Sequence, residues 1–160
     1  MTKKFLPFTL LFAFLGLFQG CICNVNLVKM YSGPDRDRDS VAILIVDYPA
    51  LAESIDDQRA GVGVYLLLPG QHNATVSYLN KMYGWKGVNA LPLRMNLQAG
   101  DTYTIGAFIT EGGTGRRWRP IYHDMGSHAM ALENLKRLDP LWVESLQKSL
   151  LDRNTWNRRQ

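Results

Sequence analysis

The chain has 160 residues, of which 46% are hydrophobic and 20% are charged, and its formal net charge is +4. These fractions are close to globular averages, so they argue against a wholly disordered chain and against an all-membrane protein. Lys3 and Lys4 lie in an N-terminal export segment, and removing them lowers the net charge from +4 to +2, which takes away the case for nucleic acid as a partner. The remaining length suits one domain with its own core.

The N-terminal segment has the order of a secretory signal. Lys3 and Lys4 give a positive start, Phe5 to Phe18 form an apolar run, and Gly20-Cys21 follow. The run is shorter than the roughly 20 apolar residues that a helix needs to span a bilayer. Gly20-Cys21 resemble the end of a bacterial lipoprotein signal, in which the cysteine sulfur receives a diacylglycerol. We therefore predict a signal peptide over residues 1–20 and lipidation of Cys21.

Two other outcomes stay open for this segment, namely a soluble secreted protein and an uncleaved anchor. If Cys21 is lipidated, the membrane is a partner through the lipid anchor, and Ile22 in place of aspartate implies the outer membrane, facing the periplasm. The chain has two cysteines, and the second is Cys23. The folded body therefore has neither a disulfide framework nor a cysteine-based zinc site.

A polar stretch follows the signal. It contains Tyr31-Ser-Gly-Pro34 and then Asp35, Asp37 and Asp39 with arginines between them. We predict a lipidated N-terminus and tether over residues 21–40. Carboxylates at alternate positions suit calcium, but the stretch lacks the glycine and the distal glutamate of a calcium loop, so no metal site is predicted.

Apolar runs rich in β-branched residues predict the first strands. Val41–Val46 suits a strand buried on both faces, and Val62–Leu68 suits a second strand. His72–Leu79 alternates apolar and polar residues, as a half-buried strand does. Leu51–Ala60 between them is polar, and we expect a loop or a short turn of helix there.

Further strands complete the predicted fold. Leu91–Leu97 and Thr102–Ile109 are expected to pair as a hairpin around a turn at Ala99-Gly100-Asp101. Glu111–Gly115 predicts another turn, and Arg116–Tyr122 a last strand. About seven short strands at regular spacing favour a mainly β protein, an antiparallel β-sandwich over residues 41–125.

One motif points to a family. Leu68-Pro-Gly-Gln-His-Asn-Ala-Thr-Val76 resembles the Leu-Pro-Gly-x-His-x-x-x-Val element of PEGA-like β-sandwich modules found in bacterial envelope proteins. Tyr31-Ser-Gly-Pro34 and Val41-Ala-Ile-Leu44 resemble the opening of small uncharacterised bacterial lipoproteins of this kind. The resemblance implies a fold and a compartment, and no activity.

The segment 126–160 changes to helical spacing. Ala131, Leu132, Leu135 and Leu138 recur at that spacing, and Asp139-Pro140 is a typical helix start. We therefore predict one or two C-terminal helices. The second carries one apolar stripe of Trp142, Val143, Leu146 and Leu150. This stripe either covers the sandwich or binds a partner.

No residue is assigned a catalytic role. The three histidines, His72, His123 and His128, show no metal-ligand spacing. Ser127, His123 and Asp124 contain the residue types of a hydrolase triad, but no nucleophile-elbow pattern surrounds the serine. A small secreted or periplasmic hydrolase using one of these histidines is the alternative function, and no cofactor is expected.

The best candidate for a binding surface is Arg116, Arg117, Trp118 and Arg119, because arginine and tryptophan dominate binding energies at interfaces. The sequence therefore predicts a non-enzymatic cell-envelope lipoprotein. Its domain would bind or scaffold another envelope component, either a protein or a glycan.

Overall fold

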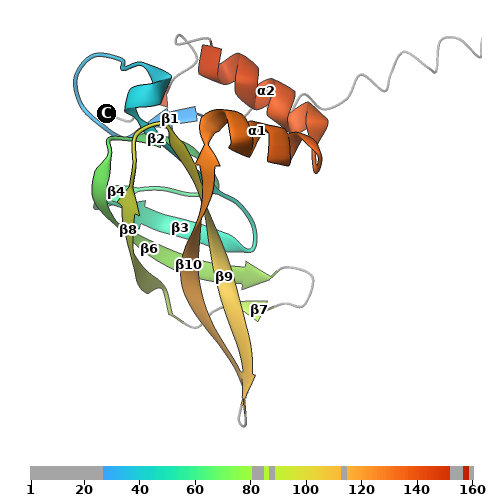
Figure 1. Cartoon of the computed structure of the whole chain (residues 1–160). Helices are drawn as coiled ribbons and strands as arrows, with labels where there is room; N and C mark the ends of the chain where they lie inside the picture. The colour runs from blue at the N-terminus through green and yellow to red at the C-terminus, as the bar shows by residue number, and fades with distance from the viewer. Residues whose placement is uncertain (1–26, 81–84, 87–88, 113–114, 152–156, 159–160) are drawn as a thin grey trace, which may run out of the picture.

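The computed structural model describes residues 27–80, 85–86, 89–112, 115–151 and 157–158 (Figure 1). The strands in these ranges are β1 (Leu27–Lys29), β2 (Ala42–Val46), β3 (Ala50–Ile55), β4 (Gln58–Arg59), β5 (Gly63–Leu67), β6 (Gly70–Asn80), β7 (Trp85–Lys86), β8 (Leu91–Leu97), β9 (Asp101–Gly112), β10 (Gly115–Ser127) and β11 (Asn157–Arg158). A 3-10 turn, η2 (Arg38–Ser40), precedes β2, and two helices, α1 (His128–Lys136) and α2 (Pro140–Leu151), follow β10. The described chain is mainly β with two C-terminal helices, as predicted.

The strands form two sheets. The six-stranded sheet has the order β10-β9-β2-β5-β1-β11, and the five-stranded sheet has the order β4-β3-β6-β7, with β8 also paired to β6. The pairs β2–β9, β1–β5 and β1–β11 are parallel. The described chain therefore has more strands than the seven or so expected for an antiparallel sandwich, and these three pairs depart from the antiparallel arrangement of the other pairs. β1 and the two-residue strands are too short to show a periodicity in the sequence.

β2 lies in the middle of the six-stranded sheet and is buried on both faces, as predicted. Ala42, Leu44 and Val46 point into a core shared with the five-stranded sheet. That core also holds Ala52 of β3 and Val76 of β6. Since successive residues of a strand face opposite sides of the sheet, Ile43 and Ile45 of β2 point away from this core.

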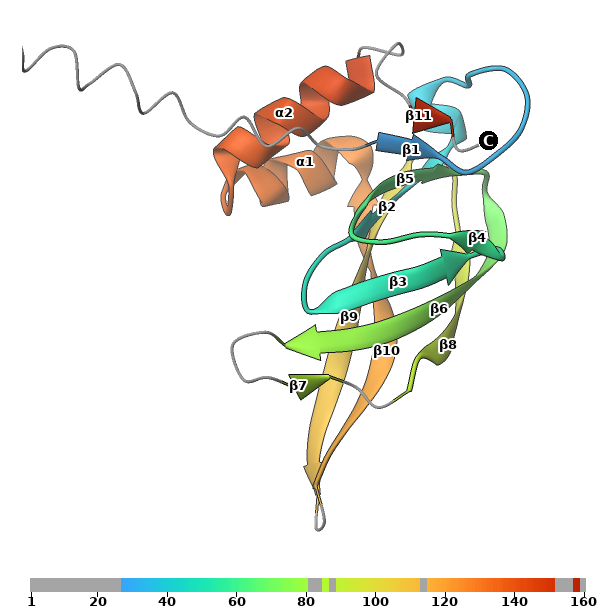
Figure 2. The ribbon, with the colours of Figure 1, turned by 180° about the vertical axis from the view of Figure 1, so that it is seen from behind.

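The opposite face of the six-stranded sheet is covered by the helices. Ile43 and Ile45 of β2 form a second cluster with Val143, Leu146 and Leu150 of α2. The apolar stripe of α2 therefore covers the sheet, which is the first of its two predicted roles. Figures 1 and 2 show both helices at one end of the molecule and the β9–β10 hairpin extending toward the other end.

The segment Leu51–Ala60, expected to be a loop, forms most of the β3–β4 hairpin. Asp56 and Asp57 are its central residues, and their φ angles of 46° and 63° are those of a type I′ turn. The strand was not recognised because its buried positions are mostly small alanines and because its register shifts between Ala52 and Ser54. Both features weaken the apolar alternation.

The predicted pairing of Leu91–Leu97 with the next strand is also wrong. β8 pairs with β6, whereas β9 pairs with β2 and β10, so the chain crosses from one sheet to the other between them. Gly100 has a φ of 81° at this crossing, and its N–H donates to the Val41 carbonyl at 2.9 Å. Gly100 allows the chain to change direction between β8 and β9, but it does not determine which strand pairs with β8.

The structure corrects the predicted tether over residues 21–40 for residues 27–30, which are buried in the domain, whereas most of residues 31–40 are exposed. Leu27 and Val28 of β1 are 1% and 2% exposed and contribute to the two cores on opposite faces of the six-stranded sheet. Lys29 follows and is buried as well. The sequence does not predict β1, because three residues, one of them a lysine, are too few to show the apolar pattern of a strand.

Candidate functional site

The signal segment 1–20 and the lipidation site Cys21 lie outside the described residues, so both stay predictions. In the part of the chain that the structure describes, no helix combines the length and the apolar character needed to cross a membrane. The same part contains no group of three or more His, Cys, Asp or Glu side chains placed to hold a metal ion.

The β9–β10 hairpin carries the predicted binding residues. Its inner face packs on the five-stranded sheet, where the rings of Trp118 and Tyr78 lie 5.8 Å apart between centroids. On its outer face, the Arg119 guanidinium lies 5.0 Å from the centroid of the Phe108 ring, within cation–π range. Phe108 is 45% exposed, and it lies directly opposite Arg119 in the hairpin register.

The predicted surface of Arg116, Arg117, Trp118 and Arg119 is consequently divided between two faces. Arg117 and Arg119 are exposed, whereas Trp118 is half-buried on the inner face. The Arg116 side chain lies outside the described part. Successive strand residues point to opposite sides, so four consecutive residues cannot form one surface. We use the name outer hairpin face for Phe108, Arg117 and Arg119.

His72 has a structural role at the start of β6. Its Nδ1 lies 2.5 Å from Asp56 Oδ2, and its Nε2 lies 2.7 Å from the Leu68 carbonyl. The other oxygen of Asp56 accepts a hydrogen bond from the Asn73 N–H at 2.9 Å. The contacts of His72 thus fasten the β3–β4 turn to the neighbouring strand and occupy both ring nitrogens.

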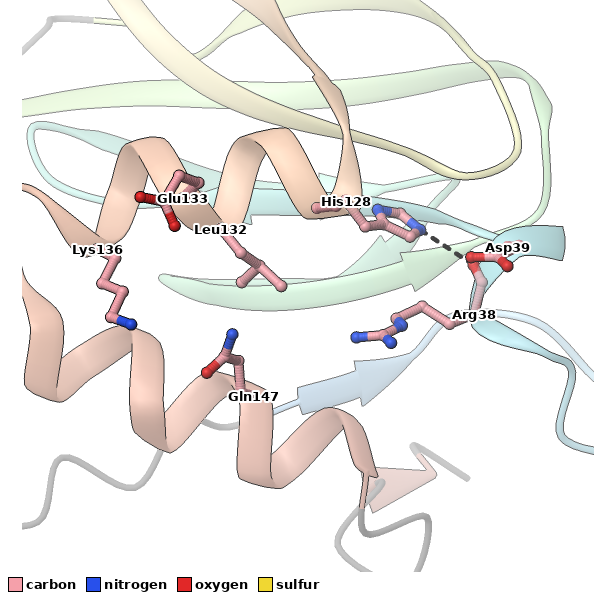
Figure 3. A pocket seen from close by; sticks show the side chains of 8 residues that line it. Arg38, Asp39, His128, Leu132, Glu133, Lys136 and Gln147 are labelled. Carbon is pink, nitrogen blue, oxygen red and sulfur yellow. Dashed lines mark hydrogen bonds between the residues drawn. The ribbon is translucent and has the colours of Figure 1, made fainter.

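His128 begins α1 and is 4% exposed. Its Nε2 donates to the Arg38 carbonyl at 3.0 Å (Figure 3), and its Nδ1 therefore accepts from the Thr102 hydroxyl at 2.8 Å. Burial lowers the pKa of His128 from its ordinary value of 6.5, although the backbone hydrogen bonds of Arg38 and Val41 act in the opposite direction. The neutral ring is therefore the form that joins α1 to η2 and β9.

The remaining candidates for a triad have local roles. Ser127 is the N-cap of α1, and its Oγ accepts from the Met130 N–H at 3.5 Å. Asp124 accepts from the Gly126 N–H at 2.7 Å. His123 is exposed on β10. No hydrogen bond within the described residues joins the side chains of Ser127, His123 and Asp124.

A pocket of about 360 Å³ lies between η2, α1 and α2. Figure 3 shows the Arg38 guanidinium on one side of it, Lys136 and Glu133 on the other, and the Gln147 amide between them. Side chains of both charges line this opening. No sequence signal could have found it, because η2 and the helices are far apart in the chain.

A second pocket of about 330 Å³ opens between β6, β8 and β10. Its lining is rich in amide, guanidinium and phenol groups that can bond to hydroxyls. It consists of Gln71, His72, Asn73, Arg94, Met95, Asn96 and Tyr122. The alternation along β6 and β8 does not reveal the pocket, since Tyr122 is supplied by a third strand.

A buried ion pair was also missed. Lys29 Nζ donates to the Gly33 carbonyl at 2.5 Å and to Asp35 Oδ1 at 2.8 Å, and it lies 4.7 Å from the Tyr31 ring centroid. The Lys29 side chain is 2% exposed. Asp35 therefore compensates a buried charge and is not simply part of a solvated run of aspartates.

The chain matches no protein-family model, and no curated protein or solved structure is significantly similar to it.

Proposed function

We propose that the protein is a non-enzymatic, lipid-anchored component of the bacterial cell envelope whose domain binds or scaffolds another envelope component. The signal-like segment ending in Gly20-Cys21 supports the anchor, with the outer membrane facing the periplasm as the location. The two sheets with a common core support a β-sandwich of the PEGA-like kind.

The outer hairpin face is the observation that carries the binding function. Phe108 and Arg119 are stacked on one another, and Arg117 lies exposed two residues earlier on the same strand. Aromatic side chains, phenylalanine included, and arginine are enriched in protein interfaces, and arginine is common among the residues that contribute most binding energy. The hairpin projects away from the helices, so a large partner can reach it (Figure 2). The two arginines favour a partner that carries carboxylates.

No specific observation favours the alternative of a hydrolase. The ring nitrogens of His72 and His128 each contact an oxygen atom of the protein itself, which favours structural roles for both side chains. The hydrolase version predicts an activity that is lost when one of His72, His123 and His128 is replaced by alanine.

The anchor is tested by fractionating cells that produce the wild type or Cys21→Ser and by measuring the intact mass of the N-terminus. We expect a lipidated chain beginning at Cys21 in the outer membrane, and loss of the lipid in the variant. A mature chain that begins elsewhere or carries no lipid contradicts the anchor.

The binding surface is tested in the same cells with a photo-crosslinking amino acid at Thr110, an exposed position on the outer side of β9. The matched position is Glu53, an exposed residue of β3. We expect a discrete crosslinked species from Thr110 that weakens in Phe108→Ala/Arg119→Ala. Equal crosslinking from both positions, or no effect of the double variant, contradicts binding at the outer hairpin face.

A further inference from the structure

The turn between α1 and α2 exposes two large apolar side chains. Leu138 is 83% exposed and Leu141 is 77% exposed, whereas Leu132, Leu146 and Leu150 of the same helical layer are buried against the sheet. Single exposed leucines are common on protein surfaces. Here, however, Leu138 follows directly on two exposed cations, Lys136 and Arg137, and Leu141 lies in the next turn of the chain. Leucines beside basic residues are the combination that binds at membrane interfaces.

The position of β1 determines which end of the domain an N-terminal anchor would hold. α2 packs against β1, which begins at Leu27, so the chain enters the domain at the end that carries the helices (Figure 2). Cys21 precedes Leu27 by roughly six residues, and even a fully extended chain covers at most about 22 Å over that length. A lipid on Cys21 would therefore keep the helical end close to the bilayer, with the hairpin at the far end.

The charges at the turn fit an anionic surface. Lys136 and Arg137 are both exposed and make no ion pair within the described part of the chain. The acidic residues nearest to them in sequence are Glu133 and Asp139. Glu133 lines the pocket beside η2 together with Lys136, and Asp139 is the cap of α2, because its Oδ1 accepts from the Trp142 N–H at 2.9 Å. Basic side chains close to a membrane are attracted by anionic headgroups.

We propose that the α1–α2 turn is a membrane-docking surface: Leu138 and Leu141 enter the headgroup region of a bilayer while Lys136 and Arg137 bind anionic phospholipid. That this turn lies close to a bilayer rests on the proposed lipid anchor. The affinity of the turn for lipid does not depend on how the protein is anchored. Docking fixes the orientation of the domain and directs the outer hairpin face away from the membrane.

The experiment uses the chain from Cys21 to Gln160 with Cys23→Ser, coupled chemically through the Cys21 thiol to one myristoyl-length chain. A single chain of this length binds membranes only marginally, so a second contact changes the partition coefficient measurably. Partition is measured by flotation with vesicles of phosphatidylcholine containing about one third phosphatidylglycerol, and with vesicles of phosphatidylcholine alone.

We expect Leu138→Asp/Leu141→Asp to lower the partition coefficient at least about tenfold. Lys136→Glu/Arg137→Glu should lower it several-fold on the anionic vesicles and much less on the neutral ones. The matched control, Ile109→Asp/Thr110→Asp, adds the same two charges on the hairpin, where both residues are exposed, and should partition like the parent chain. Thermal melting checks that each variant is folded.

Docking is refuted if the leucine variant partitions like the parent chain, or if the hairpin control loses as much binding as the leucine variant. Because the acyl chain is attached chemically, a negative result in vesicles leaves the cellular anchor untouched. Failure of the anchor is instead observed as a missing lipid on Cys21 in cells.

Discussion

Replacing Leu146 by alanine should destabilise the protein far more than the same replacement at Leu141, one turn and a half earlier on α2. Leu146 is 1% exposed in the cluster between α2 and the six-stranded sheet, whereas Leu141 is 77% exposed. The replacement removes roughly three methylene-sized groups, each contributing about 0.8 kcal/mol of transfer free energy. The cavity that is left adds to this loss, so we expect a total of about 3–4 kcal/mol.

The free energy of unfolding is measured by urea denaturation of the mature chain, followed by circular dichroism. A loss of this size is a large part of the 5–15 kcal/mol that typically stabilises a domain, and it corresponds to a fall of about 10 °C in Tm. Leu141→Ala should change the free energy of unfolding by less than about 0.5 kcal/mol. Equal effects of the two replacements would refute the packing of α2 on the sheet.

Three further variants test individual contacts. The folded protein holds His128 neutral with a lowered pKa, so the unfolded chain binds more protons as the pH falls below 6.5. Stability should decline in that range and then level off, and His128→Gln should remove this decline in urea titrations at a series of pH values. Asp35→Ala leaves the buried Lys29 without its carboxylate and should lower the free energy of unfolding by about 3 kcal/mol in the same assay. Adding Lys29→Met to this variant should partly restore the free energy of unfolding, because it removes the unpaired charge. Asp57→Gly should raise the free energy of unfolding by about 0.5–1 kcal/mol, measured by thermal melting, because glycine suits the φ of 63° at that position; an unchanged Tm would contradict a strained turn.

The sequence predicts best those elements whose burial follows one strong local pattern. Val41–Val46 contains only apolar residues, and the structure buries all of them. Asp139-Pro140 predicts the start of α2 because the cap requires only local residues, and the Asp139 hydrogen bond confirms it. In β2 and at the start of α2, a few residues that are adjacent in sequence determine the local structure.

Long-range pairing could not be predicted in the same way. The glycine turn before β9 suggests a local hairpin, yet the partners of β8 and β9 lie on different sheets. β1 was assigned to the tether because the sequence around Lys29 does not show that Asp35 will compensate its charge. The strand pairing and the burial of Lys29 both depend on residues that become neighbours only in the folded protein.

The four residues predicted as a binding surface do not share one face of the hairpin. Arg117 and Arg119 are exposed, but Trp118 points to the inner face of the hairpin. The two-residue period of a strand could have shown this, since it separates Trp118 from its neighbours. Phe108 was not identified, because its contact with Arg119 depends on the register of the two strands.

The parallel pairing of β2 with β9 has a consequence for how the chain folds. Ile43 pairs with Thr102 at the centre of the six-stranded sheet, so the middle of this sheet cannot form before most of the domain has been synthesised. Such non-local pairing slows folding, because the entropy of closing a long loop is lost before the contacts form. For a protein that we propose is exported, this delay would keep the nascent chain unfolded while it is threaded through a translocation channel.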